Sequence, residues 1–208
     1  SYEPISDGLG ISEIYRFDIG INNPDLIING QQDCGTYASD GGEWHHVNSG
    51  DGINSLIDYS NTNIMYGCSQ TGPIVRSTSG GTSADNFHRI AGVLGGTVYN
   101  GLNEESDWEL PMILDVNDPA IMFAGFENIW RSNNVNTSNH NDISWVNLTN
   151  DNLNTDYIDF LEQSPVDPFY IYVIGHNSET IFRLEDVYSQ SPTRVQLSLP
   201  AGQKATWF

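Results

Sequence analysis

Met112-Ile113-Leu114-Asp115, followed by Asp118-Pro119 and then by Ile121-Met122-Phe123-Ala124-Gly125, is the clearest copy of a phrase that recurs along this chain. The phrase is an apolar run ending near an Asp, then an Asn or Asp that Pro usually follows, then a second apolar run ending in Gly. Two short apolar runs separated by turn-forming residues are typical of paired β-strands. The other copies are residues 14–18 with Asn23-Pro24 and 26–30, residues 56–58 with Asn61 and 64–67, and, more loosely, residues 158–160 with Asp167-Pro168 and 170–175.

The spacing of the four copies indicates a repeat architecture. A period of about 40 to 55 residues, with several short strands in each unit, is what a β-propeller or a related array produces. No long stretch has the apolar spacing of an amphipathic helix, so we expect almost no helix. We predict an all-β fold, a β-propeller segment of about four blades, each a four-stranded antiparallel sheet. The approximate blade ranges are 10–50, 51–100, 101–152 and 153–205, within one domain that covers residues 1–208.

The end of the chain resembles the beginning of a repeat. Ala205-Thr206-Trp207-Phe208 is similar to Ser106-Asp107-Trp108-Glu109, which leads into the first strand of the third repeat. We therefore expect these 208 residues to be part of a larger propeller whose remaining blades lie outside them.

The charge of the chain is strongly negative, with 27 acidic and 7 basic residues and a formal net charge of −20. Such a surface repels phosphate backbones and anionic lipid heads, which disfavours nucleic acid and membrane surfaces as partners. It is compatible with cations and neutral glycans, and it is also what a simple solubility coat would look like. No run of about 18 apolar residues is present, so we expect no membrane insertion. These features favour a secreted or cell-surface location.

The chain has two cysteines, Cys34 and Cys68. They lie in adjacent repeats at different offsets from Gly30 and Gly67, so the pattern does not make them face one another. A disulfide and two free thiols both remain open, with the free thiols favoured.

The second half of each repeat carries a turn followed by an aromatic residue. In such a turn a Ser or Asp side chain caps backbone N–H groups, Gly takes positive φ angles, and the aromatic ring fills the space between neighbouring blades. We interpret these positions as structural. They are Ser39, Asp40, Gly42 and Trp44 in the first repeat, Ser77, Gly80 and Phe87 in the second, and Ser132 and Trp145 in the third.

These turns resemble a degenerate Asp-box, and other phrases are similar to the same family, the BNR-repeat propellers of the sialidase, xyloglucanase and sortilin-like superfamily. The resemblance points to secreted proteins of Bacteroidota that are exported by type IX secretion. It is firm from Ile14 to Trp145 and weak after Tyr157, and it departs at Cys34, where the family favours Asn. It implies the fold and only a general function. The phrases are residues 30–36, 49–52, 70–78 and 108–115.

Acidic residues at the blade edges raise the question of catalysis. A glycosidase needs two carboxyl groups roughly 5 to 10 Å apart. Asp33, Asp51 and Asp107 are weak candidates, and Glu104 and Glu105 precede the third repeat in the same way. Three arginines argue against a sialidase, because they occupy equivalent positions in separate repeats and cannot converge on a substrate carboxylate. These are Arg76, Arg131 and Arg183.

Metal and ligand sites are further candidates. Asp40 and Asp51 lie in Gly-rich turns that suit a calcium ion, although no EF-hand register is present. His45 and His46 are adjacent on an expected strand and point to opposite faces, so they cannot chelate one ion together. Trp108, and Trp207 by repeat equivalence, could stack on a sugar ring, whereas Trp44, Trp130 and Trp145 are better explained by interblade packing. The ligand-binding candidates are Gln32, Asp33, Asp51, Gln70 and Trp108.

Three functions follow from this pattern. The first is a non-catalytic recognition or adhesion module that binds a glycan or an extracellular protein. The second is a glycoside hydrolase with an acidic pair at the channel mouth, which requires a deep cleft and a carboxyl group of raised pKa. The third is an architectural subunit of a surface filament or large secreted assembly, in contact with other segments of the same protein.

Overall fold

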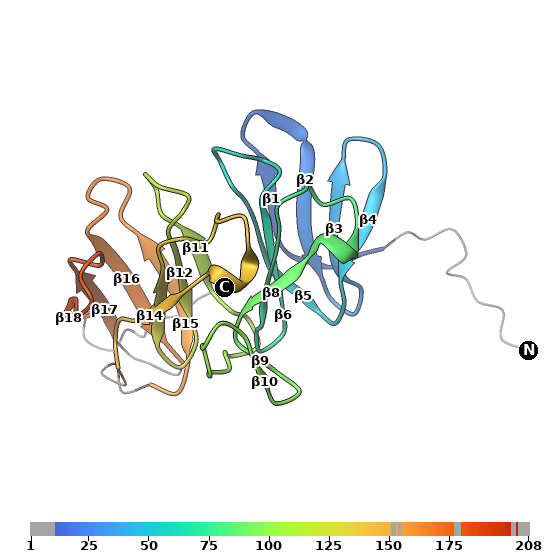
Figure 1. Ribbon diagram of the computed structural model, residues 1–208. Helices are drawn as coiled ribbons and strands as arrows, with labels where there is room; N and C mark the ends of the chain where they lie inside the picture. Colours follow the sequence, from blue (N-terminus) through green and yellow to red (C-terminus); the bar gives the residue numbers. More distant parts are fainter. Residues whose placement is uncertain (1–10, 151–152, 154, 177–179, 201–202, 204–208) are drawn as a thin grey trace, which may run out of the picture.

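A computed structural model describes residues 11–150, 153, 155–176, 180–200 and 203. Four four-stranded antiparallel sheets follow one another along the chain, each with its strands in sequence order (Figure 1). This confirms the predicted all-β fold. The helical segments within the described part are two 3₁₀ turns, Ala84–Asn86 and His140–Asp142, and no helix there is long and apolar enough to cross a membrane.

We call the four sheets blades 1 to 4, and each predicted blade range holds one of them. A two-stranded hairpin, β9 (Val93–Leu94) with β10 (Thr97–Val98), follows blade 2. Blade 1 consists of β1 (Ile14–Gly20), β2 (Asn23–Gln31), β3 (Gly35–Asp40) and β4 (Trp44–Asn48). Blade 2 consists of β5 (Gly52–Ile57), β6 (Met65–Ser69), β7 (Ile74–Ser77) and β8 (His88–Ala91). Blade 3 consists of β11 (Met112–Leu114), β12 (Met122–Gly125), β13 (Ile129–Ser132) and β14 (Trp145–Asn147), and blade 4 of β15 (Ile158–Gln163), β16 (Tyr170–Gly175), β17 (Ile181–Glu185) and β18 (Thr193–Leu197).

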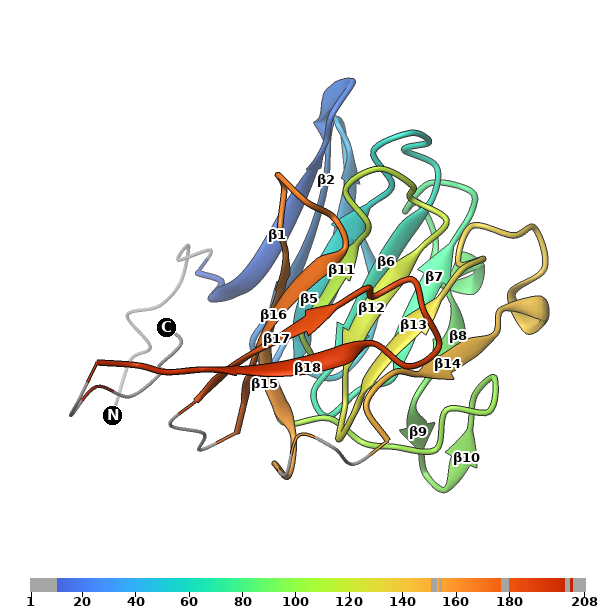
Figure 2. The same ribbon diagram turned by 90° about the vertical axis from the view of Figure 1, so that its left-hand side faces the viewer.

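The blades stack face to face, and their cores lie between them (Figures 1 and 2). We call the face that looks toward the next blade along the chain the forward face, and the opposite one the rear face. Buried apolar side chains join blades 1 and 2 around Ile28 and Met65, blades 2 and 3 around Tyr66 and Met122, and blades 3 and 4 around Phe123. The first strands lie innermost, where β5 contacts both β1 and β11, and β11 contacts β15.

The Asp of the recurring phrase caps a hairpin turn in blades 2 and 3. Oδ1 of Asp115 accepts hydrogen bonds from the backbone N–H groups of Asn117 and Asp118, at 2.9 and 3.0 Å. Oδ1 of Asp58 accepts in the same way from Ser60 and Asn61, at 2.7 and 3.0 Å. An Asp at this position replaces the solvent that the turn's N–H groups would otherwise need.

In blades 1 and 4 the Asp of the phrase does not cap the hairpin turn. Oδ2 of Asp18 instead accepts from the backbone N–H of Ile57 in blade 2, at 2.7 Å. Asp159 lies near the beginning of β15, because that strand runs on to Gln163. Its turn is capped by Ser164, whose Oγ accepts from the backbone N–H of Asp167 at 3.1 Å.

Blades 2 and 3 each carry one arginine at the same position of the third strand, and each of these arginines contacts the next blade. Nη1 of Arg76 on β7 donates to the backbone carbonyls of Val135 and Thr137 in blade 3, at 2.5 and 2.6 Å. Nη1 of Arg131 on β13 donates to the carbonyls of Val187 and Ser189 in blade 4. Both arginines are buried, so these acceptors replace the water that each guanidinium loses.

Aromatic residues make the reverse contact, from a blade to the one before it. Nε1 of Trp145 donates to the carbonyl of Ile90 in blade 2 at 2.7 Å, and Phe87 packs on the core between blades 1 and 2. Trp44 occupies the equivalent place in blade 1, paired with Ser39 as Trp145 is with Ser132. It is 51% exposed, because it lies on the rear face of the first blade. Interblade packing, the role expected for Trp44, is therefore not seen among the described residues.

The turns after the third strands of blades 1, 2 and 3 are capped by hydroxyl groups. Oγ of Ser39, Ser77 and Ser132 each accepts from the backbone N–H two residues later, at 3.2 to 3.3 Å. Gly80 has a positive φ of 73°, and in the first turn it is Gly41, with φ 90°, rather than Gly42 that does.

Both cysteines are free thiols. Cys34 is exposed at the β2–β3 turn, whereas Cys68 is buried on β6 between blades 2 and 3. The forward face of blade 2 thus holds Cys68 away from Cys34. Burial raises the pKa of the Cys68 thiol to about 12.

We expect Asp115→Ala to lower the free energy of unfolding by about 2–4 kcal/mol, because it removes a buried carboxylate that accepts from the N–H groups of the turn and from the side chains of Gln163 and Tyr188. Asp118→Ala in the same turn is the control. Asp118 is exposed and accepts one bond, from Ala120, so its loss costs about 0.5–1 kcal/mol. Urea unfolding measures both, and equal losses would contradict the role of Asp115.

We also expect one thiol of the native protein to react with a disulfide reagent at pH 8 and two to react after unfolding in guanidinium. The reason is that a buried thiol with a raised pKa supplies almost no thiolate. Cys34→Ser should abolish the native reaction and Cys68→Ser should leave it unchanged. Rapid native labelling of Cys68 would refute this assignment.

Candidate functional site

The loops at one end of the blades form a hydrogen-bonded belt that runs from blade 1 to blade 4. In its first half, Oδ1 of Asp51 accepts from the backbone N–H of Asp33 at 2.6 Å, and Oε1 of Gln70 accepts from the N–H of Asp51 at 2.9 Å. The N–H of Thr71 then donates to the carbonyl of Trp108 at 3.4 Å. We call this set of loops the loop belt: residues 32–34, 49–51, 70–73 and 103–111, with His176.

The loop belt contains every ligand-binding candidate from the sequence, but the side chains of two of them, Asp51 and Gln70, hold the loops together. Asp51 is 9% exposed, and one of its carboxylate oxygens is bonded to the backbone. Gln70 is similarly bonded to the N–H of Asp51. Gln32 and Asp33 are exposed at the β2–β3 turn, where Asp33 has a positive φ of 59°. The phrases around these residues therefore position loops in this structure.

Glu104 and Glu105 differ in their surroundings. The carboxylate of Glu104 accepts from the backbone and side chain of Asn128, and from Nε1 of Trp130 at 2.8 Å. It thereby fixes the β12–β13 turn. Glu105 is exposed.

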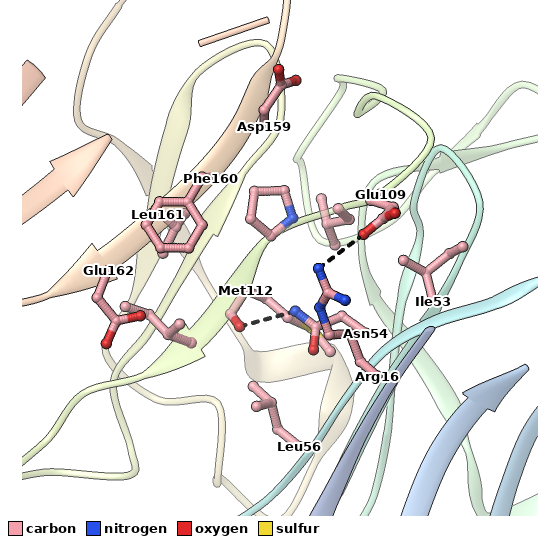
Figure 3. A pocket seen from close by; sticks show the side chains of 13 residues that line it. Arg16, Ile53, Asn54, Leu56, Glu109, Met112, Asp159, Phe160, Leu161 and Glu162 are labelled. Carbon is pink, nitrogen blue, oxygen red and sulfur yellow. Dashed lines mark hydrogen bonds and ion pairs between the residues drawn. The ribbon is translucent and has the colours of Figure 1, made fainter. Parts of the chain in front are cut away.

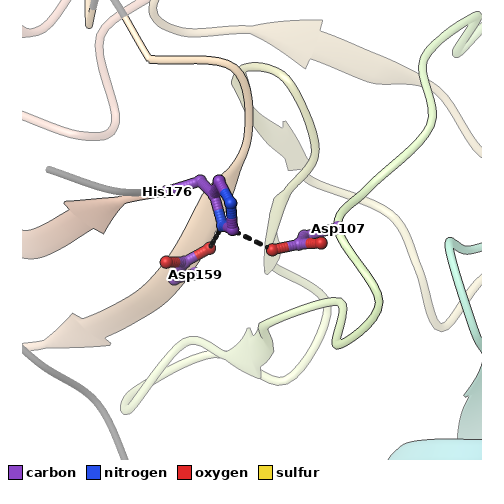
Figure 4. Close-up of side chains that lie close together, drawn as sticks. All are labelled: Asp107, Asp159 and His176. Carbon is purple, nitrogen blue, oxygen red and sulfur yellow. Dashed lines mark hydrogen bonds and ion pairs between the residues drawn. The ribbon is translucent and has the colours of Figure 1, made fainter.

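Asp107 comes together with two residues of blade 4 that the sequence did not single out as a site (Figure 4). Nδ1 of His176 lies 2.7 Å from Oδ2 of Asp107 and 3.1 Å from Oδ1 of Asp159. All three side chains are partly buried. The two carboxylates thus share one imidazole, which bridges the third and fourth blades at the loop belt.

The electrostatics of this cluster favour a charged imidazole. Burial alone would lower the pKa of His176, but the hydrogen bonds and charges of Asp159 and Asp107 outweigh it and raise the pKa above 6.5. Burial raises the pKa of Asp159, and the bond to His176 opposes that rise. The two carboxylates therefore favour the protonated form of His176.

A cavity of about 230 Å³ lies beside the cluster, on the inner side of the blades (Figure 3). The first strands of all four blades line it. Nη2 of Arg16 pairs across it with Oε2 of Glu109 at 3.2 Å, and Nδ2 of Asn54 donates to the carbonyl of Met112 at 3.3 Å. Asp159 and Glu162 also line the cavity, and burial raises the pKa of Glu162.

Trp108 lies between Asp107 and Glu109, and its indole is exposed. Its backbone is held on both sides, because its N–H donates to Oδ1 of Asp107 at 2.7 Å and its carbonyl accepts from Thr71. The side chain is 47% exposed. A flat aromatic surface therefore stands on a fixed backbone beside charged groups. Trp207, its repeat equivalent, lies outside the described residues.

The two calcium candidates do not come together. Asp51 lies at the loop belt, next to the beginning of β3, and Asp40 lies at the other end of that strand. Oδ1 of Asp40 accepts from the N–H groups of Glu43 and Gly42, which lowers the pKa of its carboxyl. Within the described ranges, the group of three side chains able to ligate one ion is Asp107, Asp159 and His176. Two carboxylates and an imidazole suit calcium less well than an all-oxygen set.

Sequence reasoning missed Asp159 and His176 for an identifiable reason. The repeat phrase assigned Asp159 to a strand end, and His176 lies in a turn with no motif around it. A bulge between Ile158 and Phe160 shifts the register of β15 at Asp159. Only the tertiary structure brings these residues to Asp107.

Comparisons with known proteins agree with the architecture. No family model matches this chain, and no curated protein matches it. Among solved structures, YCF48 from Cyanidioschyzon merolae superposes with a TM-score of 0.59 and 15% identity, over 90% of this chain and 57% of that one. A GH74 enzyme from Niastella koreensis superposes with a TM-score of 0.57 and 11% identity, over 91% of this chain and 30% of the enzyme.

The fold is of the β-propeller type. The identities are too low to carry an activity, so these likenesses show the fold alone. This chain spans 57% of the length of YCF48 and 30% of the length of the GH74 enzyme. The cavity is lined by the first strands of the blades, which are also the strands that contact one another from blade to blade.

We expect the imidazole of His176 to titrate above 6.5 and that of His140 below it, because burial and the neighbouring charges of His88 and Arg76 lower the pKa of His140. Protonated His176 then stabilises the fold fully below its unfolded pKa, and this contribution is lost as pH rises through the folded pKa. Imidazole NMR titration measures both residues. Asp159→Asn should lower the pKa of His176 and leave His140 unchanged, and an unshifted His176 would refute the cluster.

Proposed function

We propose that this chain is a non-catalytic recognition module of a secreted or cell-surface protein, and that its loop belt binds a neutral glycan. The observation that carries the proposal is the exposed indole of Trp108, whose backbone is held by Asp107 and Thr71. An indole face stacks on the C–H surface of a sugar ring, and neighbouring carboxylates accept hydrogen bonds from its hydroxyl groups. An extracellular protein is the other partner compatible with this surface.

The charge of the chain supports a neutral ligand over an anionic one. The net charge is −20, and Asp107, Glu109, Asp159 and Glu162 all lie at or near the proposed site. A sulfated or carboxylated polymer would be repelled. A neutral oligosaccharide has hydroxyl groups that both donate and accept.

The arrangement of Asp107 and Asp159 supports binding over hydrolysis. Both carboxylates contact the same Nδ1, so the imidazole occupies the space where a glycosidic bond would lie between an acid and a nucleophile. The glycoside hydrolase alternative retains one supporting observation, the raised pKa of Asp159 beside a cavity. Release of reducing sugar by the protein would favour that alternative.

The test is binding of xyloglucan and cello-oligosaccharides, measured by calorimetry, with heparin as the anionic comparison. Trp108→Ala should raise the Kd for the oligosaccharide that binds by about five- to thirtyfold, because stacking on one aromatic ring contributes about 1–2 kcal/mol. Trp44→Ala is the matched control, since Trp44 is similarly exposed but lies on β4, outside the loop belt. Equal losses in the two variants, or tighter binding of heparin, would contradict the proposal.

A further inference from the structure

Blade 4 repeats a device that joins the central blades to their neighbours. The third strands of blades 2, 3 and 4 each contain Ile, any residue, then Arg, and the arginine pairs across the ladder with an aromatic residue of the second strand. Each arginine therefore lies on the forward face of its blade. The three sets are Ile74, Arg76 and Tyr66; Ile129, Arg131 and Phe123; and Ile181, Arg183 and Tyr172.

In blades 2 and 3 the next blade covers this face, and the arginine donates hydrogen bonds to main-chain carbonyls of that blade. Arg76 and Arg131 each donate to two carbonyls, two residues apart, in the connection between the next blade's third and fourth strands. The first carbonyl of each pair belongs to a fully buried valine, Val135 or Val187. At both interfaces, therefore, an arginine on one blade contacts a connection of the next blade that contains a buried valine.

Blade 1 has no arginine at this position, and the connection of blade 2 that contacts it has no valine there. Ala38 stands at the arginine position, opposite Ile28 on the second strand. The connection of blade 2 meets it with Gly81, where an added Cβ would lie 2.2 Å from Cβ of Ala38. A small residue on one blade goes with a glycine on the next, so the two sides of each interface fit each other.

The forward face of blade 4 has an arginine at this position, as blades 2 and 3 do. Among the described residues, however, no blade covers this face. Arg183 forms an ion pair with Glu185 on its own strand and lies over the ring of Tyr170, 5.1 Å from its centroid. Its side chain is 31% exposed, whereas Arg76 and Arg131 are 2% and 3% exposed as residues. Around Arg183 the same face presents a partly exposed apolar surface. Its members are Tyr172, Ile174, Ile181, Val195 and Leu197.

We propose that the forward face of blade 4 is a blade–blade interface, and that its occupant is a further propeller blade of the same protein, from outside residues 1–208. That blade is a four-stranded antiparallel sheet. Its third-to-fourth strand connection presents an apolar residue and two carbonyls, two residues apart, to the guanidinium of Arg183. This inference is independent of the proposed glycan site, which lies at the loop belt.

The alternative occupant, blade 1 of a second copy, fits less well. Its third-to-fourth strand connection is the short turn of residues 41–43, and Gly42 stands where the later connections have valine. A connection with glycine at this place is expected to contact a small residue such as Ala38 rather than an arginine. Two copies of net charge −20 would also repel each other.

The test is arginine modification of the native full-length protein with phenylglyoxal, read residue by residue by mass spectrometry. The six arginines provide internal references: Arg76 and Arg131 are buried, and Arg89 is exposed. We expect Arg183 to react more than about tenfold more slowly than Arg89, as the buried pair does. Glu185→Gln is the matched variant. If a blade covers Arg183, its protection persists in this variant, and if only the ion pair slows the reaction, protection is lost.

Three results would overturn the proposal. The first is reaction of Arg183 at the rate of Arg89 in the native protein. The second is loss of protection in Glu185→Gln. The third is protection that disappears on dilution, which would identify a second copy as the occupant. Loss of glycan binding in Trp108→Ala would leave this outcome unaffected, so the two proposals fail separately.

Discussion

The contact on which the architecture depends is a buried guanidinium that donates to main-chain carbonyls of the next blade. A charged group at Arg76 or Arg131 is costly to bury unless acceptors replace its water, and the neighbouring connection supplies two carbonyls to each. The first carbonyl of each pair belongs to a buried valine, so each arginine contact lies within the apolar packing between two blades. The apolar cores between blades then fill the space that this contact defines.

The stacking of the blades also determines what the loop belt can do. Asp107 precedes blade 3, whereas Asp159 and His176 belong to blade 4, so the cluster exists only because these blades are held face to face. The bonds through Asp51 and Gln70 extend the same rigid edge to blades 1 and 2. The backbone of Trp108 is therefore held on a preorganised surface, which is the kind of surface that lowers the entropic cost of the glycan binding proposed for it.

The sequence predicted the fold well because strands, turns and periodicity are local properties. Four apolar pairs with capped turns indicated four sheets, and the Asp of blades 2 and 3 does cap its turn. Of the candidate site residues, Asp107 lies in the cluster with His176 and Trp108 is exposed beside it, whereas Asp51, Gln70 and Glu104 are bonded to loop atoms. Asp159 and His176 escaped notice because their proximity to Asp107 depends on a β-bulge and on the packing of one blade against another, neither of which leaves a local pattern.

Recognition of backbone rather than side chains at the blade interfaces has an evolutionary consequence. Since Arg76 and Arg131 contact carbonyls, which every residue possesses, the parts of each connection other than its buried valine are free to change sequence and length. The Asn-rich stretch of residues 133–142 is such a change, and Arg76 still finds its acceptors there. A unit that carries this arginine could accept a duplicated or recombined successor with few compensating mutations. Repeat number in such a protein can then vary by gene duplication while each junction is preserved.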